Sequence, residues 1–277
     1  MSTYSKKLLP LFRWSSIACG LIVLLSCTKK ENITTIDTSG GKAAAGADLG
    51  DPAKKEIAMQ LVASAENSTL DWRGQFQYVE DIKDGRGYTT GIVGFTTGTG
   101  DVLQLVNLYQ SKAPGNVLSA YLPALIRVNG SDSHAGLDPG FPAAWRQAAK
   151  DTLFQQIQVQ VCDSLYFFPA RELAKKDGLN ILGQFIYFDA AVMHGYEGLE
   201  QIRNKTLLSA TTPAAGGGEE AYLEIFLNNR VTEMKKEAAH DDVSRVEGAQ
   251  RKFLREHNLS LTPPLKWKIY DVDYSIK

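Results

Sequence analysis

The sequence has little cysteine and no long hydrophobic run. Of its three cysteines, Cys19 and Cys27 lie near the N-terminus, and only Cys162 lies in the remainder of the chain. That remainder therefore holds no second thiol with which to form an internal disulfide. The main apolar run, at 17–26, has ten residues, whereas a membrane-spanning helix needs about 20. The run is thus too short to cross a bilayer.

The sequence also lacks an excess of basic charge. It has 30 Lys and Arg residues against 31 Asp and Glu residues. Residues 1–26 hold three of the basic residues and none of the acidic ones, so 27 basic residues face 31 acidic ones from Cys27 onward. The segment 56–101 alone has seven acids and three bases, and no basic face with interleaved aromatic residues stands out. These features argue against a nucleic-acid partner and favour a cationic ligand.

Signals for metal ions and nucleotides are missing as well. The four histidines do not have the spacing of metal ligands. The glycines at 98–100 follow a predicted strand, but the residues around them do not complete a phosphate-binding loop. We therefore expect neither a metal ion nor another cofactor.

The N-terminus has the pattern of an export signal. Lys6, Lys7 and Arg13 precede the apolar run, as in a secretory signal peptide. The run ends in Leu24-Leu-Ser-Cys27, which resembles a bacterial lipobox and implies cleavage before Cys27 and lipidation of that cysteine. Residues 28–50 are polar and rich in Gly and Ala, which indicates a flexible tether. We expect a signal peptide at 1–26, the lipidated Cys27 and tether at 27–50, and a folded domain at 51–277. Thr28 favours the outer membrane.

The folded part is predicted to be mainly helical. Asp51-Pro52 can cap a first helix that ends near Glu66. Alternating or β-branched residues at 75–79 and 88–95 predict short strands, which the turn at 84–87 separates. Helical patterns follow at 101–110, 116–128, 142–166, 169–177, 179–194, 198–209, 219–239 and 243–257. The expected fold is mainly α (α+β), with one small antiparallel sheet beside a cleft between two lobes.

Two acids, Glu66 and Asp84, form a candidate catalytic pair. Glu66 follows apolar residues at the end of the first helix, and partial burial would raise the pKa of its carboxyl group, as a general acid requires. Asp84 lies in a glycine-flanked turn, where a solvated carboxylate suits a general base. Two carboxyl groups in opposed environments across a cleft are the minimum apparatus for glycosidic cleavage. Spacing alone does not distinguish this pair from solvated surface acids.

Longer motifs around the pair strengthen this interpretation. The strings Ser64-Ala-Glu-Asn-Ser68, Tyr78-Val-Glu-Asp-Ile-Lys-Asp-Gly-Arg-Gly-Tyr-Thr89 and Gly94-Phe-Thr-Thr-Gly-Thr-Gly-Asp101 closely resemble the chitosanases of glycoside hydrolase family 46. Further matches, such as Val192-Met-His-Gly195 and Pro263-Pro-Leu-Lys-Trp-Lys268, extend the resemblance over about 49–270. The resemblance implies a lysozyme-like, two-lobed fold and endo-hydrolysis of β-1,4-linked glucosamine chains with inversion. The substrate would thus be chitosan, a cationic polysaccharide.

The resemblance also implies roles for individual residues. Glu66 would protonate the leaving oxygen, and Asp84, helped by Thr89, would activate water on the opposite face of the sugar. Since deacetylated glucosamine has no acetyl carbonyl to act as an internal nucleophile, the enzyme must activate water itself. The matching cleft residues that would bind substrate are Asp101, Arg86, Glu80, Asp81 and Glu237. Asp189, Arg230 and Arg245 match a network that would orient Glu66 without touching sugar.

Some readings remain open at this stage. Arg86 could instead form an ion pair that stabilises the turn, and Trp72, Trp145 and Trp267 could be either sugar platforms or core residues. Lys83 stands before Asp84 where the family has a neutral residue, often glycine, and its effect depends on whether its ammonium group points inward. The segment after Gly195 is shorter than in close relatives. We expect a monomer whose only membrane contact is the lipid on Cys27.

Two rival functions remain. One is a non-catalytic glycan-binding surface lipoprotein. The other is a lysozyme-like hydrolase of another amino-polysaccharide, such as peptidoglycan.

Overall fold

The computed structural model describes residues 48–236 and 241–277, which all belong to one compact unit, Ala44–Lys277. The predicted signal peptide, the lipidation site Cys27 and the substrate-binding candidate Glu237 lie outside the described residues. The folded part begins at Asp48 at the latest, before the expected boundary at 51. Leu49 is fully buried, and its backbone N–H donates to Gln184 Oε1 at 2.9 Å. Residues 48–50 are therefore packed rather than part of a free tether.

The first helix, α1 (Pro52–Glu66), forms as the sequence predicts. The carboxylate of Asp51 accepts from the backbone N–H of Ala53 at 2.9 Å, and Pro52 occupies the first turn, where its missing N–H costs nothing. The apolar face of α1 is buried, and the helix packs on α7 (Ile181–Leu207). Glu66 is the last residue of α1, so the candidate acid lies at the C-terminal end of this helix.

The small sheet is shorter than the sequence predicts. It consists of β1 (Val79–Glu80), β2 (Thr89–Thr90) and β3 (Phe95–Thr96), antiparallel in that order. The predicted strand at 88–95 is instead a hairpin, in which Phe95 pairs with Thr90. Gly91 and Gly94 cause the reversal, with φ angles of 70° and 72° that favour glycine. Most of the predicted strand at 75–79 is a 3₁₀ helix, η1 (Arg73–Gln77).

Helices make up most of the remaining chain, and several of their boundaries differ from the prediction. The helices predicted at 179–194 and 198–209 are one element, α7, with a kink at Gly195, and α8 ends at Met234. The predicted helix 142–166 breaks before Asp151, which caps a new helix by accepting from the N–H of Leu153 at 2.9 Å. No break occurs at Pro169, because a π turn shifts the hydrogen-bond pattern just before that residue. The elements are α2 (Asp101–Lys112), η2 (Ser119–Tyr121), α3 (Leu122–Val128), α4 (Phe141–Ala148), α5 (Thr152–Cys162), η3 (Asp163–Phe167), α6 (Phe168–Lys176), α7, η4 (Pro213–Ala215), α8 (Glu219–Met234), η6 (Arg245–Gln250) and α9 (Arg251–Arg255).

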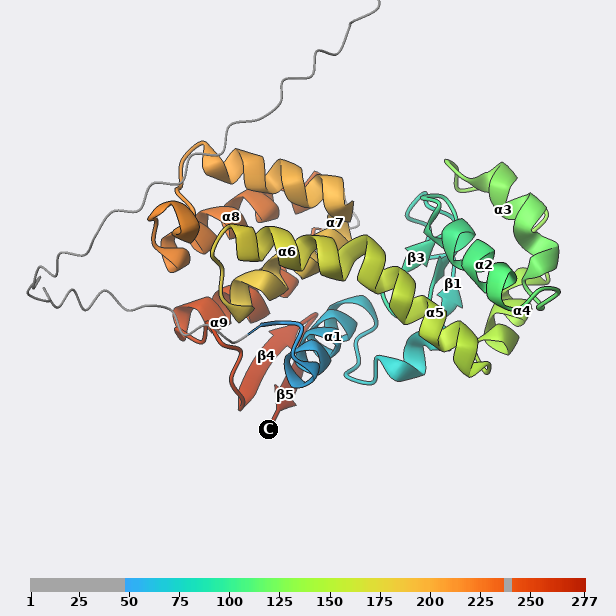
Figure 1. The fold of residues 1–277 in the computed structure, drawn as a ribbon, viewed down its shortest axis with the longest axis horizontal. Coiled ribbons are helices and arrows are strands. Elements are labelled where there is room, and N and C mark those ends of the chain that lie inside the picture. Colours follow the sequence, from blue (N-terminus) through green and yellow to red (C-terminus); the bar gives the residue numbers. More distant parts are fainter. Residues whose placement is uncertain (1–47, 237–240) are drawn as a thin grey trace, which may run out of the picture. The chain divides into compact units, whose positions relative to one another are not determined.

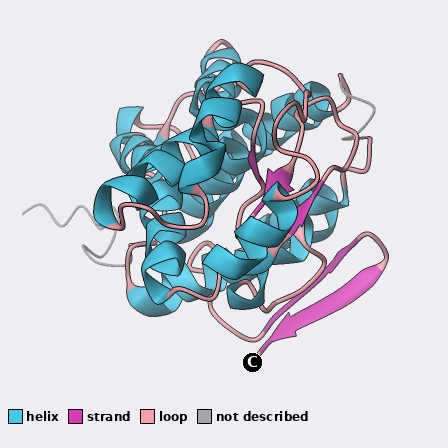
Figure 2. Ribbon diagram, turned by 90° about the vertical axis from the view of Figure 1, so that its right-hand side faces the viewer, coloured by secondary structure: helices cyan, strands magenta, loops and turns pink. Residues whose placement is uncertain are grey.

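A C-terminal hairpin is the element that the sequence analysis does not predict. Strands β4 (Leu265–Ile269) and β5 (Val272–Ile276) pair antiparallel, with Ile269 opposite Val272. Tyr270 and Asp271 form the two-residue turn, both with positive φ. The hairpin lies along one side of the unit and ends at the C-terminus (Figure 2).

Within this unit the elements form two groups, or lobes (Figure 1). In one lobe, α2 packs on α3 and α5, while α4 packs on η1 and β1. In the other lobe, α7 packs on α1, α6 and α8, while η6 packs on β4. The helical segments α5, η3 and α6 follow one another without a gap and link the two lobes. The mainly helical fold with a small antiparallel sheet confirms the predicted fold class.

Candidate active site

A cleft of about 610 Å³ lies between the two lobes. One wall comes from the sheet region and the start of α2, with Arg86, Gly94, Thr96, Thr99 and Asp101. The opposite wall comes from the middle of α7 and the end of α8, and Leu165 and Tyr166 of η3 complete the lining. Most of these side chains are polar, which suits a hydrated, hydrogen-bonding ligand.

Glu66, at the end of α1, is not among the residues that line this cleft but lies next to its wall. Its Oε1 pairs with Nη1 of Arg245 at 2.6 Å, and its side chain is 21% exposed. Its Oε2 lies 3.5 Å from the position that a Cβ atom would occupy on Gly94, a residue of the cleft wall. One carboxylate oxygen is thus held by an arginine, while the other lies at the cleft wall.

Asp84 lies in the predicted turn, but it is less solvated than the sequence analysis expects. Its side chain is only 4% exposed. Oδ1 accepts from the backbone N–H of Arg86 at 3.0 Å, and Oδ2 accepts from Nε and pairs with Nη2 of the same residue at 2.8 and 2.7 Å. The Arg86 side chain therefore covers Asp84 and compensates its charge. Because Arg86 also lines the cleft, it is both a turn-stabilising ion-pair partner and a cleft residue.

Tyr78 has a negatively charged environment. Burial raises the pKa of Tyr78, and the negative charges of Glu80, Glu66 and Asp84 raise it further. Glu80 itself is exposed and accepts a long hydrogen bond of 3.4 Å from the Tyr78 hydroxyl.

Thr89 lies at the same wall, on β2. Its Cγ2 is 3.4 Å from the position of a Cβ on Gly94, so Thr89 and Glu66 flank the same glycine. Within the described part of the chain, the buried Thr89 Oγ1 has no hydrogen-bond partner. Buried hydroxyl groups normally have one, so this oxygen is available to a water molecule or a substrate hydroxyl.

Asp101 begins α2 and faces the cleft. Its Oδ2 accepts from the hydroxyl of Tyr166 at 2.8 Å. Burial and the charge of Asp101 hold the pKa of Tyr166 well above its usual value, so the phenol remains a hydrogen-bond donor. A carboxylate fixed in this way, with its other oxygen left to accept, suits a protonated amine.

Behind Glu66 lies a buried network of charges. Arg245 binds Asp189 through Nε and Nη2 at 2.7–3.0 Å while its Nη1 binds Glu66. Arg230 is fully buried and pairs with Asp189 Oδ2 at 2.8 Å. Burial alone would raise the pKa of Asp189, but the guanidinium groups of Arg245 and Arg230 lower it to about 2. The structure thus brings together Asp189, Arg230 and Arg245, and connects them to Glu66.

Asp81 and Lys83 form a separate pocket of about 370 Å³ with Gly85, Asp132 and His134. The ammonium group of Lys83 pairs with Asp81 Oδ2 at 2.5 Å and is highly exposed, so it points away from Asp84. Lys83 has a φ of 61°, a conformation that favours glycine. The structure therefore does not place Asp81 among the residues that line the cleft with Asp101.

Several cleft residues escape the sequence analysis. Glu197 and Tyr196 lie just after a kink at Gly195, where φ is 71° and ψ is 166°, and both line the cleft. Glu233 of α8 lines it too, and pairs with Lys236 at 2.6 Å. Glu197 and Glu233 lie in no sequence motif. The one sequence feature that points to this wall is the segment after Gly195, which is expected to be shorter than in relatives.

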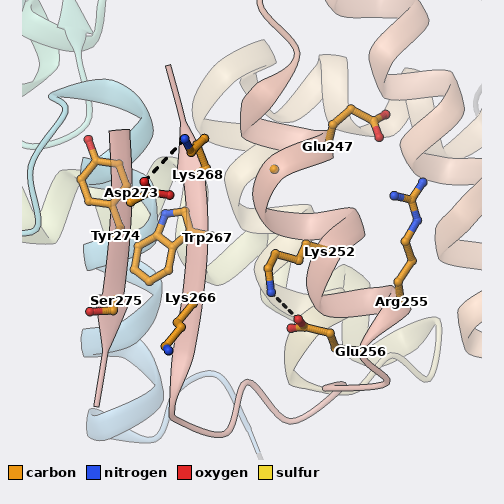
Figure 3. A pocket seen from close by; sticks show the side chains of 11 residues that line it. Glu247, Lys252, Arg255, Glu256, Lys266, Trp267, Lys268, Asp273, Tyr274 and Ser275 are labelled. Atoms are coloured by element: carbon orange, nitrogen blue, oxygen red, sulfur yellow. Dashed lines mark hydrogen bonds and ion pairs between the residues drawn. The ribbon is translucent and has the colours of Figure 1, made fainter. Parts of the chain in front are cut away.

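Another cavity, of about 740 Å³, lies between η6, α9 and the C-terminal hairpin (Figure 3). Its lining has four basic residues, Lys252, Arg255, Lys266 and Lys268, and three acidic ones, Glu247, Glu256 and Asp273, so it has no excess of negative charge to attract a cationic ligand. Trp267 lies in its wall but is 2% exposed, and Trp72 and Trp145 are also buried. The three tryptophans are therefore core residues and not sugar platforms.

Two kinds of feature are absent from residues 48–236 and 241–277. In these ranges no group of His, Cys, Asp and Glu side chains could hold a metal ion. None of the helices there is both long enough and apolar enough to cross a membrane. Cys162 is buried, and burial raises the pKa of its thiol, so it is not a reactive nucleophile.

The chain is similar to known proteins of one family. The model of glycosyl hydrolase family 46 matches residues 60–265. A chitosanase of Streptomyces sp. (strain N174) is 57% identical over 236 residues, which cover 84% of this chain and 85% of that protein. The solved structure of chitosanase OU01 with substrate has a TM-score of 0.82 at 48% identity, over 83% of this chain and 99% of that one. A Gynuella sunshinyii chitosanase solved with chitotetraose has a TM-score of 0.75 at 30% identity, over 80% of this chain and 97% of that one. The chain therefore belongs to glycosyl hydrolase family 46.

Proposed function

We propose that this protein is an endo-acting chitosanase that hydrolyses β-1,4 linkages between glucosamine residues with inversion at the anomeric carbon. The proposal is supported by Glu66 Oε2, which lies near Gly94 of the cleft wall, by Asp84, which is bound by the cleft residue Arg86, and by 57% identity to a chitosanase. Relatives of this family have also been solved with substrate and with chitotetraose.

In this mechanism Glu66 is the general acid. Its Oε1 is held by Arg245, so Oε2, at the cleft wall beside Gly94, carries the proton to the leaving glycosidic oxygen. The bond from the anomeric carbon to that oxygen breaks, and the departing chain leaves with a new hydroxyl group.

Asp84 is the general base on the opposite face of the sugar. It accepts a proton from a water molecule while the water oxygen forms a bond to the anomeric carbon. The free hydroxyl of Thr89 supports the same water, since its oxygen lacks a partner among the described residues. Attack from this face converts a β linkage into an α product.

Substrate binding depends on charge. Glucosamine amines are largely protonated in mildly acidic solution, and the cleft presents Asp101, Glu197 and Glu233 to them. Asp101 binds an amine directly, and Arg86 contacts sugar hydroxyls while it holds Asp84. Exposed Glu80, beside Tyr78, contributes further negative charge.

Glu66→Gln and Asp84→Asn test the assignment. Each variant should lose hydrolysis of glucosamine polymer by roughly 10²–10⁴-fold, because general acid and general base catalysis each contribute about that much. Reducing-sugar release measures the loss, and circular dichroism confirms folding. Glu172→Gln, which changes an exposed acid on α6, is the matched control and should keep full activity. Full turnover by either active-site variant, or faster cleavage of acetylated than of deacetylated chains by the unaltered protein, would refute the assignment.

The N-terminus supports a second proposal, that the protein is exported and held at the outer membrane by lipid on Cys27. Its basis is the basic, apolar and Leu24-Leu-Ser-Cys27 pattern, followed by Thr28. The domain acts as a monomer, and the lipid is its membrane contact. Cys27→Ala should move the protein from the membrane fraction of expressing cells to the soluble fraction. An unchanged distribution would contradict lipidation.

A further inference from the structure

The segment that carries Arg245 is a π turn. η6 (Arg245–Gln250) runs directly into α9, and in a π turn the hydrogen bonds join residues five apart. In an α-helix, residues five apart point in directions that differ by about 140°. The wider π winding instead brings Arg245 and Gln250 to the same side. Both side chains accordingly reach one carboxylate, that of Asp189.

Gln250 connects the two charged partners of this network. Its Nε2 donates to Asp189 Oδ2 at 2.6 Å, and its Oε1 accepts from Arg230 Nη1 at 2.9 Å. The side chain is 1% exposed, so water cannot replace these bonds easily. One end must donate to a carboxylate and the other must accept from a guanidinium group. An amide does both, whereas a carboxylate in its place would face Asp189 with like charge.

These bonds extend to the candidate acid through Arg245. Asp189 Oδ2 receives Gln250, Arg230 and the Nε of Arg245, which fixes the plane of the carboxylate. That carboxylate in turn fixes the planar guanidinium group of Arg245, whose remaining nitrogen, Nη1, binds Glu66 Oε1. Two residues, Asp189 and Arg245, separate Gln250 from Glu66, and Gln250 does not line the cleft.

We propose that Gln250 is a positioning residue for the reaction: through Asp189 and Arg245 it orients the carboxyl group of Glu66 toward the glycosidic oxygen. The inference rests on the proposed function, since it assigns a task to Glu66 as proton donor. It adds to the Asp189, Arg230 and Arg245 network a fourth member that the π turn puts in place. Its loss affects proton delivery more than substrate binding, because Gln250 touches no substrate.

Gln250→Leu tests the proposal, with Gln184→Leu as the matched control. Gln184 is also a buried glutamine with two hydrogen bonds in the same lobe, to Leu49 and Leu179, and it does not contact Asp189. Well below the melting temperature of both variants, kcat of Gln250→Leu should fall on the order of tenfold or more, with KM within about twofold. The pH dependence of kcat should shift as well, whereas Gln184→Leu should keep the kcat and the pH profile of the unaltered protein.

Three outcomes separate the possibilities. If Gln250→Leu is folded and has the kcat and pH profile of Gln184→Leu, Gln250 is merely structural and the inference is overturned. If Gln250→Leu does not fold, Gln250→Glu, which keeps the size, replaces it and should show the same selective loss of kcat; full activity would again overturn the inference. Glu66→Gln is measured in parallel. Retained activity there would refute the proposed function itself, whereas its inactivity beside a fully active Gln250→Leu would refute the inference alone.

Discussion

The two candidate catalytic acids differ mainly in the partners that bind their carboxylate oxygens. Glu66 has one oxygen held by Arg245 and one at the cleft wall. Asp84 is nearly buried, and both of its oxygens are bound by a single residue, Arg86. Arg86 fixes the orientation of the Asp84 carboxylate by binding both of its oxygens. The solvated carboxylate expected from the glycine-flanked turn is therefore wrong, because the Arg86 side chain covers it.

Lys83 offers a test at the scale of one residue. A lysine at a φ of 61° pays a conformational cost that glycine does not. The Lys83 side chain is highly exposed, so its ion pair with Asp81 contributes little to stability. Lys83→Gly should therefore raise the melting temperature by roughly 2–4 °C and leave kcat unchanged, as differential scanning fluorimetry and a rate assay can show.

Lys83→Ala is the control for this effect. It removes the same ion pair but keeps a Cβ atom in the left-handed conformation. Its melting temperature should stay at or slightly below that of the unaltered protein. If both variants behave alike, backbone strain at Lys83 is not the cause.

The lowered pKa of Asp189 predicts that the free energy of unfolding depends on pH. Its pKa falls from the ordinary 3.8 to about 2 in the folded protein, because Arg245 and Arg230 outweigh the effect of burial. A carboxyl group with a depressed pKa stabilises the folded state fully above its unfolded pKa, and this contribution is lost as the pH falls toward the folded pKa.

The difference in unfolding free energy between the unaltered protein and Asp189→Asn should thus be constant above about pH 5 and shrink by on the order of 2 kcal/mol toward pH 2. Urea unfolding at several pH values measures it. Asp273→Asn, at an exposed site on β5, is the control. A difference for Asp189→Asn that does not change with pH would show that its pKa is not depressed.

Among the elements, the C-terminal hairpin supports the segment that holds Glu66. Strand β4 packs so closely on η6 that a Cβ atom on Gly248 would lie 2.0 Å from the backbone oxygen of Lys268. Gly248 lies inside the π turn, between Arg245 and Gln250. The approach of the two backbones therefore sets the position of the whole buried network.

Gly248→Ala should destabilise the protein by roughly 2 kcal/mol, because a methyl group against a backbone oxygen forces β4 or η6 to move. It should also lower kcat, since Arg245 moves with η6. Gly218→Ala, where a Cβ atom would meet open space, should change neither quantity. Thermal unfolding and rate measurements on both variants decide the matter, and equal stabilities would show that the hairpin contact is not needed.

The sequence predicts the long elements well and the short ones poorly. Helix α1 is predictable because Asp51 and Pro52 give local start signals. The hairpin at 89–96 is hidden because each strand has two residues, so alternation cannot appear within it. The strand β4 does alternate between buried and exposed residues, but Tyr270 and Asp271 form its turn in place of the usual Asn-Gly, and the signal is lost.

The residues of the site also divide into those that the sequence predicts and those that it does not. Motifs identify Glu66, Asp84, Thr89 and Asp101, because these residues lie in continuous strings around the sheet. Gln250 and Glu197 come from distant helices, and only the fold brings them to the network and to the cleft. Neither residue has a local pattern that distinguishes it from an ordinary polar residue of a helix.

At the scale of the whole molecule, the two lobes and the cleft between them form the lysozyme-like fold of glycosyl hydrolase family 46. α1 places Glu66 beside the cleft, the sheet region carries Asp84 and Thr89, and Arg245 binds Glu66 from behind. The segment 56–101, which includes the sheet, has seven acids against three bases. This excess of negative charge favours a cationic ligand.

The central claim is that Glu66 and Asp84 act on opposite faces of one sugar, with water between Asp84 and the anomeric carbon. Proton NMR of the products first formed from a glucosamine hexamer tests it most directly. The account predicts that the α anomer appears first and then equilibrates, and that neither Glu66→Gln nor Asp84→Asn produces it. Initial appearance of the β anomer would show that the configuration is retained, and would contradict the assignment of Asp84 as a base that activates water.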